Sequence, residues 1–387
     1  MNKPRMSEDI CFLKRENNPR RQSAVTFSCL GKLRSADASL LSQWKIRLGD
    51  MIRQAMNGNG VPRFPLVIGL AESGIIPSAL FHQILREQGI HAEWICSTRR
   101  PANGIHFKES HSHGPDHILP LPCRQPEELW FVEDEITTGK TVLRLALSLC
   151  EVLNVRRARF FAIADTRCSE DANRFEMLLN DHGIGHSVHT LLRFGKETSS
   201  LPPSKGDFEE SLLEGGAGGC AGKSEIRISE SETKTSSLPP SKGESEETSS
   251  LSPSKEDLKG SEANWHFPEQ RPALRNQLDV SLSVSKRFPI RKTETGTLLV
   301  VGEAIDIALK IIQEYPSLSF RHVTLSPWQM DGKHIFKRLD ICGTYYLYNH
   351  HHLKSPLYVF SDPIDTHIGT EVAKLMIRKG FVVKGVF

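Results

Sequence analysis

The sequence predicts an α/β protein with two parallel-sheet units, and three observations support that fold class. Short apolar segments of strand length recur along the chain, and several are followed by a longer segment with helical periodicity. A chain of 387 residues is too long for one ordinary core. A segment of low complexity interrupts the apolar pattern. We therefore predict domains at residues 1–195 and 271–387, the second being the smaller, joined by a flexible linker at 196–270.

The first unit shows alternating strand and helix patterns. Residues 66–70, "LVIGL", form a short apolar run, and Ile76, Leu80 and Ile84 follow it at helical spacing, with Gly89 placed to end the helix. Four further strands are predicted at 92–98, 129–133, 159–165 and 187–193, and a helix at 141–153. Strands separated by helices indicate a mainly parallel sheet.

The second unit repeats this pattern. Residues 297–312, "TLLVVGEAIDIALKII", predict a strand, a turn and a helix, and further strands follow at 321–327 and 356–362. A helix and a last strand are predicted in 368–387. Ligands of such sheets gather at the carboxyl ends of the strands. The residues predicted at those ends are Gly69, Glu133, Asp134, Glu303 and Asp362.

The predicted linker is rich in Ser, Glu, Lys, Gly and Pro. It contains near-copies of one segment: "ETSSLPPSKG" from Glu197, "KTSSLPPSKG" from Lys234 and "ETSSLSPSKE" from Glu247. Such a sequence buries too little apolar surface to offset its ordering entropy, so we expect disorder. A flexible tether also leads us to expect two units without a fixed mutual orientation.

Bulk properties exclude several classes of protein. A net charge of +3 gives no sign of nucleic-acid binding, and no helix-turn-helix pattern is present. No apolar run reaches the roughly 18 residues that a membrane span needs, and the N-terminus lacks a secretory signal. The eight cysteines form no C-x-x-C pair, which argues against a disulfide framework or a structural zinc site. We expect a cytoplasmic protein.

Residues 129–141, "LWFVEDEITTGKT", place two carboxylates beside a turn rich in Thr and Gly. The turn resembles a nucleotide-binding P-loop, but Asp134 stands where that motif needs Gly. A ribose 5-phosphate satisfies both features: carboxylates accept hydrogen bonds from its hydroxyls, while the turn and the start of the next helix bind its phosphate. A strand end followed by a capping Thr is the simpler alternative, but it leaves the acid pair unexplained.

This stretch resembles the diphosphoribosyl-binding signature of type I phosphoribosyltransferases. It departs from the pattern at Trp130 and Glu135. The resemblance implies a phosphoribosyltransferase-like parallel sheet with flanking helices and a reaction of phosphoribosyl diphosphate with Mg²⁺. It implies catalytic roles for Glu133 and Asp134, which would also meet Mg²⁺ directly or through substrate hydroxyls or water. The 5′-phosphate would lie at Thr137, Thr138, Gly139, Lys140 and Thr141.

Two further segments occupy places that this family uses. Residues 69–74, "GLAESG", stand where such enzymes contact diphosphate, through Ala71, Glu72, Ser73 and Gly74; an ordinary strand–helix turn is the alternative. The polar segment 99–120 stands where the mobile loop lies. Its candidates are Arg99, Arg100 and Lys108 for diphosphate, and Glu109, His111 and His113 for substrate. A metal site at His111, His113 and His117 and solvated histidines are both alternatives.

The chain also resembles a narrower group, phosphoribosyltransferases fused to a C-terminal TRSP domain. The resemblance lies in "NNPRR" and "SCLGK" within 17–32, in "FKESHSH", and in "VTLSPW" and "YYLYN" of the second unit. These proteins occur in bacterial gene neighbourhoods associated with tellurite resistance and stress. "TLSP" at 324–327 lacks the Arg that gives the domain its name. The site candidates of this unit are Gly302, Glu303, Thr324, Ser326 and Asp362.

The sequence favours an enzyme that makes or salvages a nucleotide-like metabolite from phosphoribosyl diphosphate and a nucleobase-like molecule. The resemblance also implies a possible homodimer. Base selection falls to less diagnostic sequence, with Arg20, Arg21 and Lys32 as candidates. Two alternatives remain: a homologue that senses the sugar diphosphate through a partner without catalysis, and a P-loop nucleotide kinase, which Asp134 disfavours. The base, the reaction direction and any catalysis by the second unit stay open.

Overall fold

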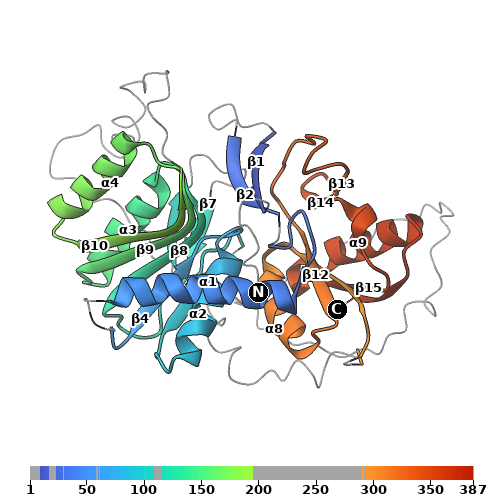
Figure 1. Cartoon of the computed structure of the whole chain (residues 1–387), viewed down its shortest axis with the longest axis horizontal. Helices are drawn as coiled ribbons and strands as arrows, with labels where there is room; N and C mark the ends of the chain where they lie inside the picture. Colours follow the sequence, from blue (N-terminus) through green and yellow to red (C-terminus); the bar gives the residue numbers. More distant parts are fainter. Residues whose placement is uncertain are drawn as a thin grey trace, which may run out of the picture.

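The computed structural model describes residues 9–16, 23–28, 30–57, 60, 62–100, 102–108, 116–194, 290–291 and 293–386. Within these residues the chain forms two α/β units that lie side by side (Figure 1). The predicted linker lies outside the described residues. None of the helices in the described part of the chain is both long and apolar enough to span a membrane.

The first unit is built on a parallel sheet with strand order β10-β9-β8-β4-β5. Its strands are β4 (Pro65–Gly69), β5 (Glu93–Cys96), β8 (Glu128–Ile136), β9 (Arg157–Asp165) and β10 (Gly185–Arg193). All five strands predicted from the apolar runs are therefore confirmed, with boundaries shifted by one to three residues. The sheet class and its flanking helices agree with the prediction.

Helices cover both faces of this sheet. They are α1 (Ala38–Met56) and α2 (Ile75–Glu87) on one face, and α3 (Lys140–Val152) and α4 (Ser169–Asp181) on the other. Strand β8 supplies both cores because its side chains alternate: Trp130 and Val132 pack with α1 and α2, whereas Leu129 and Phe131 pack with α3. Helix α1 was not predicted, although Leu41, Trp44 and Leu48 bury one of its faces.

Two antiparallel hairpins accompany the first sheet. Strand β1 (Ile10–Lys14) pairs with β2 (Ser23–Phe27) near the N-terminus. Strand β6 (Ile105–Lys108) pairs with β7 (Asp116–Leu119), within the segment predicted as a loop. The segment 99–120, which stands where the family's mobile loop lies, therefore contains a hairpin, and its role as a mobile loop stays a prediction. Ile105 and Leu119 pair across the hairpin and are buried in the same core cluster as strands of the sheet, which stabilises the hairpin against it.

The second unit is built on a sheet with strand order β16-β15-β11-β12-β3. Its parallel strands are β11 (Gly296–Val301), β12 (Leu318–Val323), β15 (Leu357–Phe360) and β16 (Val383–Val386). Helices α8 (Ile305–Glu314) and α9 (Thr366–Arg378) belong to different core clusters on its two sides. A hairpin of β13 (Arg338–Ile341) and β14 (Tyr345–Tyr348) and the short helices η3 (Gly302–Ala304), η4 (His350–His352) and η5 (Pro363–Asp365) complete the unit.

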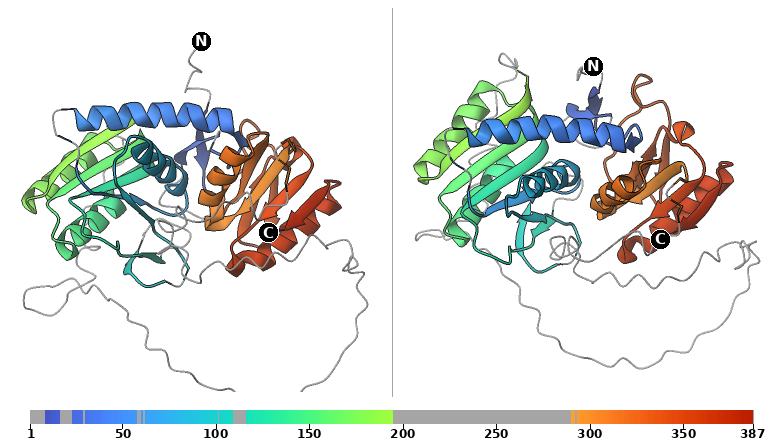
Figure 2. Two further views of the ribbon diagram at one scale, coloured as in Figure 1. Left: turned by 90° about the horizontal axis from the view of Figure 1, so that it is seen from below. Right: turned by 60° about the horizontal axis from the view of Figure 1, so that its bottom comes forward.

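The two units share a sheet and a core. Strand β3 (Ala36–Asp37), from the N-terminal part, pairs antiparallel with β12 through Asp37 with Ser319 and Ala36 with Phe320. One hydrophobic cluster joins α1 and α2 to α8, and Figure 2 shows these helices beside one another. The expectation of two units without a fixed mutual orientation is therefore wrong. A tether in the sequence says nothing about the apolar surface that each unit presents to the other.

Candidate functional site

The turn after β8 leads directly into α3. Gly139 has a φ of 75°, and a Cβ atom there would lie 2.8 Å from the ring of Phe175, so another residue would be strained and crowded. Helix α3 begins at Lys140, and its N-cap has no side-chain hydrogen bond. The first N–H groups of a helix are unsatisfied within it and attract anions. The start of α3 therefore offers backbone donors beside residues 137–141, and their assignment to a 5′-phosphate stays a prediction.

The predicted acid pair lies at the end of β8. Glu133 and Asp134 are both partly exposed. A Cβ atom at Gly74 would lie 2.9 Å from Glu133 Oε2, so this carboxylate lies against the loop that follows β4. Glu135 is engaged differently, since its Oε1 accepts a hydrogen bond of 2.9 Å from Thr166 of the neighbouring strand end. This hydrogen bond engages the residue at which the stretch departs from the family pattern.

The loop after β4 is the second part of the site. It spans 70–74 and folds tightly: Gly74 N donates to Leu70 O at 2.9 Å, and Ala71 N donates to Ser97 Oγ at 2.8 Å. The peptide bond between Ala71 and Glu72 is cis. A Cβ atom at Gly74 would approach Leu70 N within 2.7 Å, so only glycine fits there. Gly74 also precedes α2, which places another helix start beside Glu133.

Glu72 connects this loop to the second unit. Its side chain is buried, and Oε1 lies 2.5 Å from His322 Nε2. Its other oxygen accepts hydrogen bonds of 3.1 Å from both Thr324 Oγ1 and Leu325 N. Burial alone raises the pKa of Glu72, but His322, together with Lys32 and Arg99, lowers it to about 2. Glu72 is thus a carboxylate anchored in the second unit.

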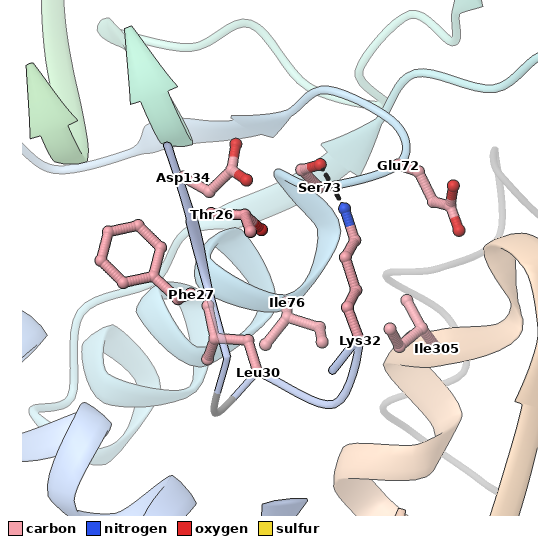
Figure 3. Close-up of a pocket in the computed structure, with 9 residues that line it drawn as sticks. All are labelled: Thr26, Phe27, Leu30, Lys32, Glu72, Ser73, Ile76, Asp134 and Ile305. Atoms are coloured by element: carbon pink, nitrogen blue, oxygen red, sulfur yellow. Dashed lines mark hydrogen bonds between the residues drawn. The ribbon is translucent and has the colours of Figure 1, made fainter. Parts of the chain in front are cut away.

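A small pocket lies between Asp134 and this loop (Figure 3). The side chain of Lys32 extends into it and donates a hydrogen bond of 2.6 Å to Ser73 Oγ. Asp134 and Glu72 flank the amine on opposite sides in this view. The free volume is about 10 Å³, which suits a single water molecule. The remaining lining residues are Thr26, Phe27, Leu30, Ile76 and Ile305.

The basic residues after β5 point in different directions. Arg99 donates to Ala71 O at 3.4 Å, so its guanidinium lies at the loop 70–74. Arg100 instead forms ion pairs with Asp362 and Asp365 of the second unit. The side chain of Lys108 and residues Glu109, His111 and His113 lie outside the described residues. His117 is buried on β7, and its Nδ1 lies 3.3 Å from Ser97 Oγ.

The candidates in the second unit face the first unit. Glu303 accepts hydrogen bonds from Thr98 Oγ1 at 2.6 Å and from Arg99 N at 2.9 Å. Thr324 contacts Glu72, and Asp362 pairs with Arg100. Gly302 precedes Glu303, and Ser326 N donates to Thr324 Oγ1 at 3.1 Å. These residues follow β11, β12 and β15, whereas their partners follow β4 and β5. The carboxyl edges of the two sheets therefore face one another.

Sequence reasoning missed a buried support beneath the phosphate turn. Arg167 binds Asp165 through two hydrogen bonds of 3.0 and 2.9 Å and lies 4.8 Å above the ring of Phe175. Its Cδ would lie 3.5 Å from a Cβ atom at Gly139. Asp165 ends β9, so the rule that polar residues at strand ends build the site would have found it. His322 lies inside a strand, and no local signal marks it.

Comparison with known proteins agrees with this geometry. Residues 10–194 match a family model described as phosphoribosyl transferase. This part of the chain is therefore a phosphoribosyltransferase domain, which confirms the enzyme class predicted from residues 129–141. The match ends before the second unit, so it leaves the predicted TRSP domain as a prediction. No curated protein matches the chain.

The chain is also similar to solved adenine phosphoribosyltransferases. One is from Giardia lamblia, in complex with 9-deazaadenine: identity is 13%, coverage is 51% of this chain and 99% of that chain, and the TM-score is 0.35. The enzyme from Rhodothermus marinus shares 17% identity, with coverage of 49% of this chain and 96% of that chain and a TM-score of 0.33. A third enzyme is from Trypanosoma brucei, in complex with AMP, pyrophosphate and ribose-5-phosphate. It shares 10% identity, with coverage of 54% of this chain and 90% of that chain and a TM-score of 0.35.

Proposed function

We propose that this enzyme transfers a phosphoribosyl group between diphosphate and a nucleobase-like molecule, with phosphoribosyl diphosphate as substrate or product. The observation that carries the proposal is the placement of Glu133 and Asp134 between the phosphate-type turn at 137–141 and the loop 70–74. A ligand with a phosphate at one end, hydroxyls in the middle and a diphosphate at the other matches these three parts in order.

In the forward direction the bond between ribose C1 and a diphosphate oxygen breaks, and its electron pair leaves with the diphosphate. A bond forms between C1 and a ring nitrogen of the base, which loses its proton to solvent. The transition state carries positive charge on the ribose. Glu133 and Asp134 would accept hydrogen bonds from the ribose hydroxyls, and their negative charge would stabilise that cation. The positioning of both reactants supplies the rest of the catalysis.

The 5′-phosphate would bind at Thr137, Thr138, Gly139, Lys140 and Thr141. Backbone N–H groups at the start of α3 and the Thr hydroxyls are the donors, and Lys140 adds charge. Arg167 and Phe175 pack beneath Gly139 and would hold the turn in place. Binding energy from this remote phosphate would fix C1 relative to the acid pair.

The residues at the strand end also fit Mg²⁺. Glu133 and Asp134 are adjacent, partly exposed carboxylates, and Mg²⁺ binds through one or two such groups together with substrate oxygens. When bound, it would neutralise charge on the diphosphate and orient it. Among the described residues, no group of three or more His, Cys, Asp or Glu side chains is arranged to hold a metal.

The diphosphate would lie against Ala71, Glu72, Ser73 and Gly74. Arg99 already contacts the carbonyl of Ala71, so its charge is available on this side. The side chain of Glu72 binds Thr324 and His322 of the second unit, so Glu72 would anchor the loop to that unit. The second unit would thereby set the position of the backbone that meets the diphosphate.

We further propose that the second unit is a TRSP domain and that the enzyme serves stress-associated metabolism of a nucleotide-like compound, in the tellurite-resistance context that the resemblance implies. The motifs "VTLSPW" and "YYLYN" support this proposal. Thr324 of "TLSP" donates a hydrogen bond to Glu72, and Leu325 stands where the name-giving Arg of the domain would be. A cytoplasmic location and a homodimer belong to the same proposal.

Calorimetric titration with phosphoribosyl diphosphate and Mg²⁺, followed by a panel of bases with detection of released diphosphate, tests the function. Binding followed by release with one base supports the transferase and names its substrate. Binding without release from any base supports the sensing alternative. Absence of binding, or preferential binding of ATP with Mg²⁺, contradicts the proposal, the second outcome in favour of a kinase.

A further inference from the structure

Lys32 is a buried cation at the centre of the candidate site. It lies in the turn region between β2 and β3, and only 6% of it is exposed. Charged lysines are almost never buried to this extent without a compensating partner. The sequence associated this residue with base selection. In the structure its amine donates a hydrogen bond to Ser73, on the loop that follows β4.

The hydrogen-bond partner described for this amine is a neutral hydroxyl. Ser73 Oγ accepts at 2.6 Å, and an ammonium group has three donors, so Lys32 can bind further acceptors. Burial lowers the pKa of Lys32, whereas the nearby carboxylates of Glu72 and Asp134 raise it and favour the charged form. The charge of Lys32 thus depends on negative groups around the pocket.

The nearest acid of the loop is directed elsewhere. Glu72 places one oxygen 2.5 Å from His322 and accepts two hydrogen bonds on the other, both from the second unit. Its charge is therefore largely balanced by groups other than Lys32. Asp134, on the opposite side of the amine, is assigned to the ribose hydroxyls. Asp134, Lys32 and Ser73 line the same pocket, so a ligand that spans from Asp134 to the loop 70–74 would come to the amine of Lys32.

We propose that Lys32 donates hydrogen bonds to the diphosphate oxygens of phosphoribosyl diphosphate and stabilises the negative charge that develops when the bond to ribose C1 breaks. The electron pair moves to the diphosphate oxygen, while the ammonium keeps its proton. This inference rests on the proposed function. Lys32 reaches the site from the N-terminal turn, so its role is separate from those of the loop backbone and Arg99. Its fixed charge costs little reorganisation during the reaction.

The test compares ligands that differ by the diphosphate. Full-length wild type, Lys32→Met and Lys32→Gln are titrated with phosphoribosyl diphosphate and with ribose 5-phosphate, each with Mg²⁺. Loss of a charge-assisted hydrogen bond is expected to weaken phosphoribosyl diphosphate binding about 10- to 100-fold. Ribose 5-phosphate binding should change less than about twofold, because that ligand lacks the group that Lys32 meets. Lys32→Gln can still reach Ser73 and serves if the Met variant does not fold.

The controls separate the possible failures. Lys45→Met removes a partly exposed lysine of α1 that pairs with Glu87 away from the pocket, and it should bind both ligands like wild type. If wild type binds neither ligand, the proposed function fails. If wild type binds both and a folded Lys32 variant retains full affinity for phosphoribosyl diphosphate, the role of Lys32 is refuted while the function stands. Equal weakening for both ligands would also overturn the role, since it would show that Lys32 only shapes the pocket.

Discussion

Replacement of Glu72 by Gln tests whether this carboxylate anchors the two units to each other. The change keeps the shape of the side chain and removes its charge beside His322. The pKa of Glu72 falls from its ordinary 4.5 to about 2, and at about 1.4 kcal/mol per pH unit this favours the folded state by about 3 kcal/mol. Removal of one partner from a buried ion pair typically costs about 3–5 kcal/mol, which agrees in size.

The pH dependence makes this prediction specific. Because the folded pKa is lowered, the stabilisation is complete above pH 4.5 and is lost as the pH falls toward about 2. Between pH 7 and pH 3 the difference in unfolding free energy between wild type and Glu72→Gln should shrink by about 2 kcal/mol. Urea denaturation followed by tryptophan fluorescence measures it. Exposed Glu87→Gln is the control and should leave stability unchanged. A difference that is below about 1 kcal/mol at pH 7, or that is constant with pH, would refute the anchoring role.

The remaining predictions concern the site and the contact between the units. Asp134→Asn should keep the fold and weaken phosphoribosyl diphosphate binding at least about 10-fold, since a carboxylate acceptor is lost; calorimetry with unchanged affinity would contradict the ribose assignment. Gly139→Ala should weaken ribose 5-phosphate binding, because its φ of 75° and the 2.8 Å approach to Phe175 force the turn to move; binding equal to wild type would mean that the phosphate lies elsewhere. Arg100→Met should lower the unfolding free energy by about 3 kcal/mol, as it leaves Asp362 and Asp365 without their buried partner. Denaturation with an unchanged midpoint would count against that contact.

The strands of both sheets other than β3 could be predicted because they contain short apolar runs bounded by polar or turn residues. In β8 the run from Leu129 to Val132 is buried on both faces, and this pattern does not depend on distant parts of the chain. The run ends at Val132 whereas the strand continues to Ile136, so Glu133 and Asp134 could be placed near the carboxyl end of β8 although the strand boundary was missed. Their roles, and those of the turn at 137–141, remain predictions.

What could not be predicted depends on contacts between distant segments. Strand β3 has two residues, too few to show any periodicity, and it exists because β12 pairs with it. Helix α1 is different, since Leu41, Trp44 and Leu48 stand at helical spacing and Asp37 caps the helix, a local signal that the prediction overlooked. His322 lies in an apolar strand, and its role appears only when Glu72 comes within 2.5 Å of it. Local propensity contains no information about such pairs.

The carboxyl edges of the two sheets face one another, and this placement bears on the role of the second unit. In parallel sheets this edge carries the ligand groups, so a unit that served only for stability would have no reason to be placed there. Yet Glu303, Thr324 and Asp362 bind the segments after β4 and β5, which are the segments assigned to diphosphate. Loop positions in one unit are therefore set by side chains of the other. The second unit has to be in place for the loop 70–74 and Arg99 to hold their described positions, and the proposed site belongs to the whole chain rather than to residues 10–194 alone.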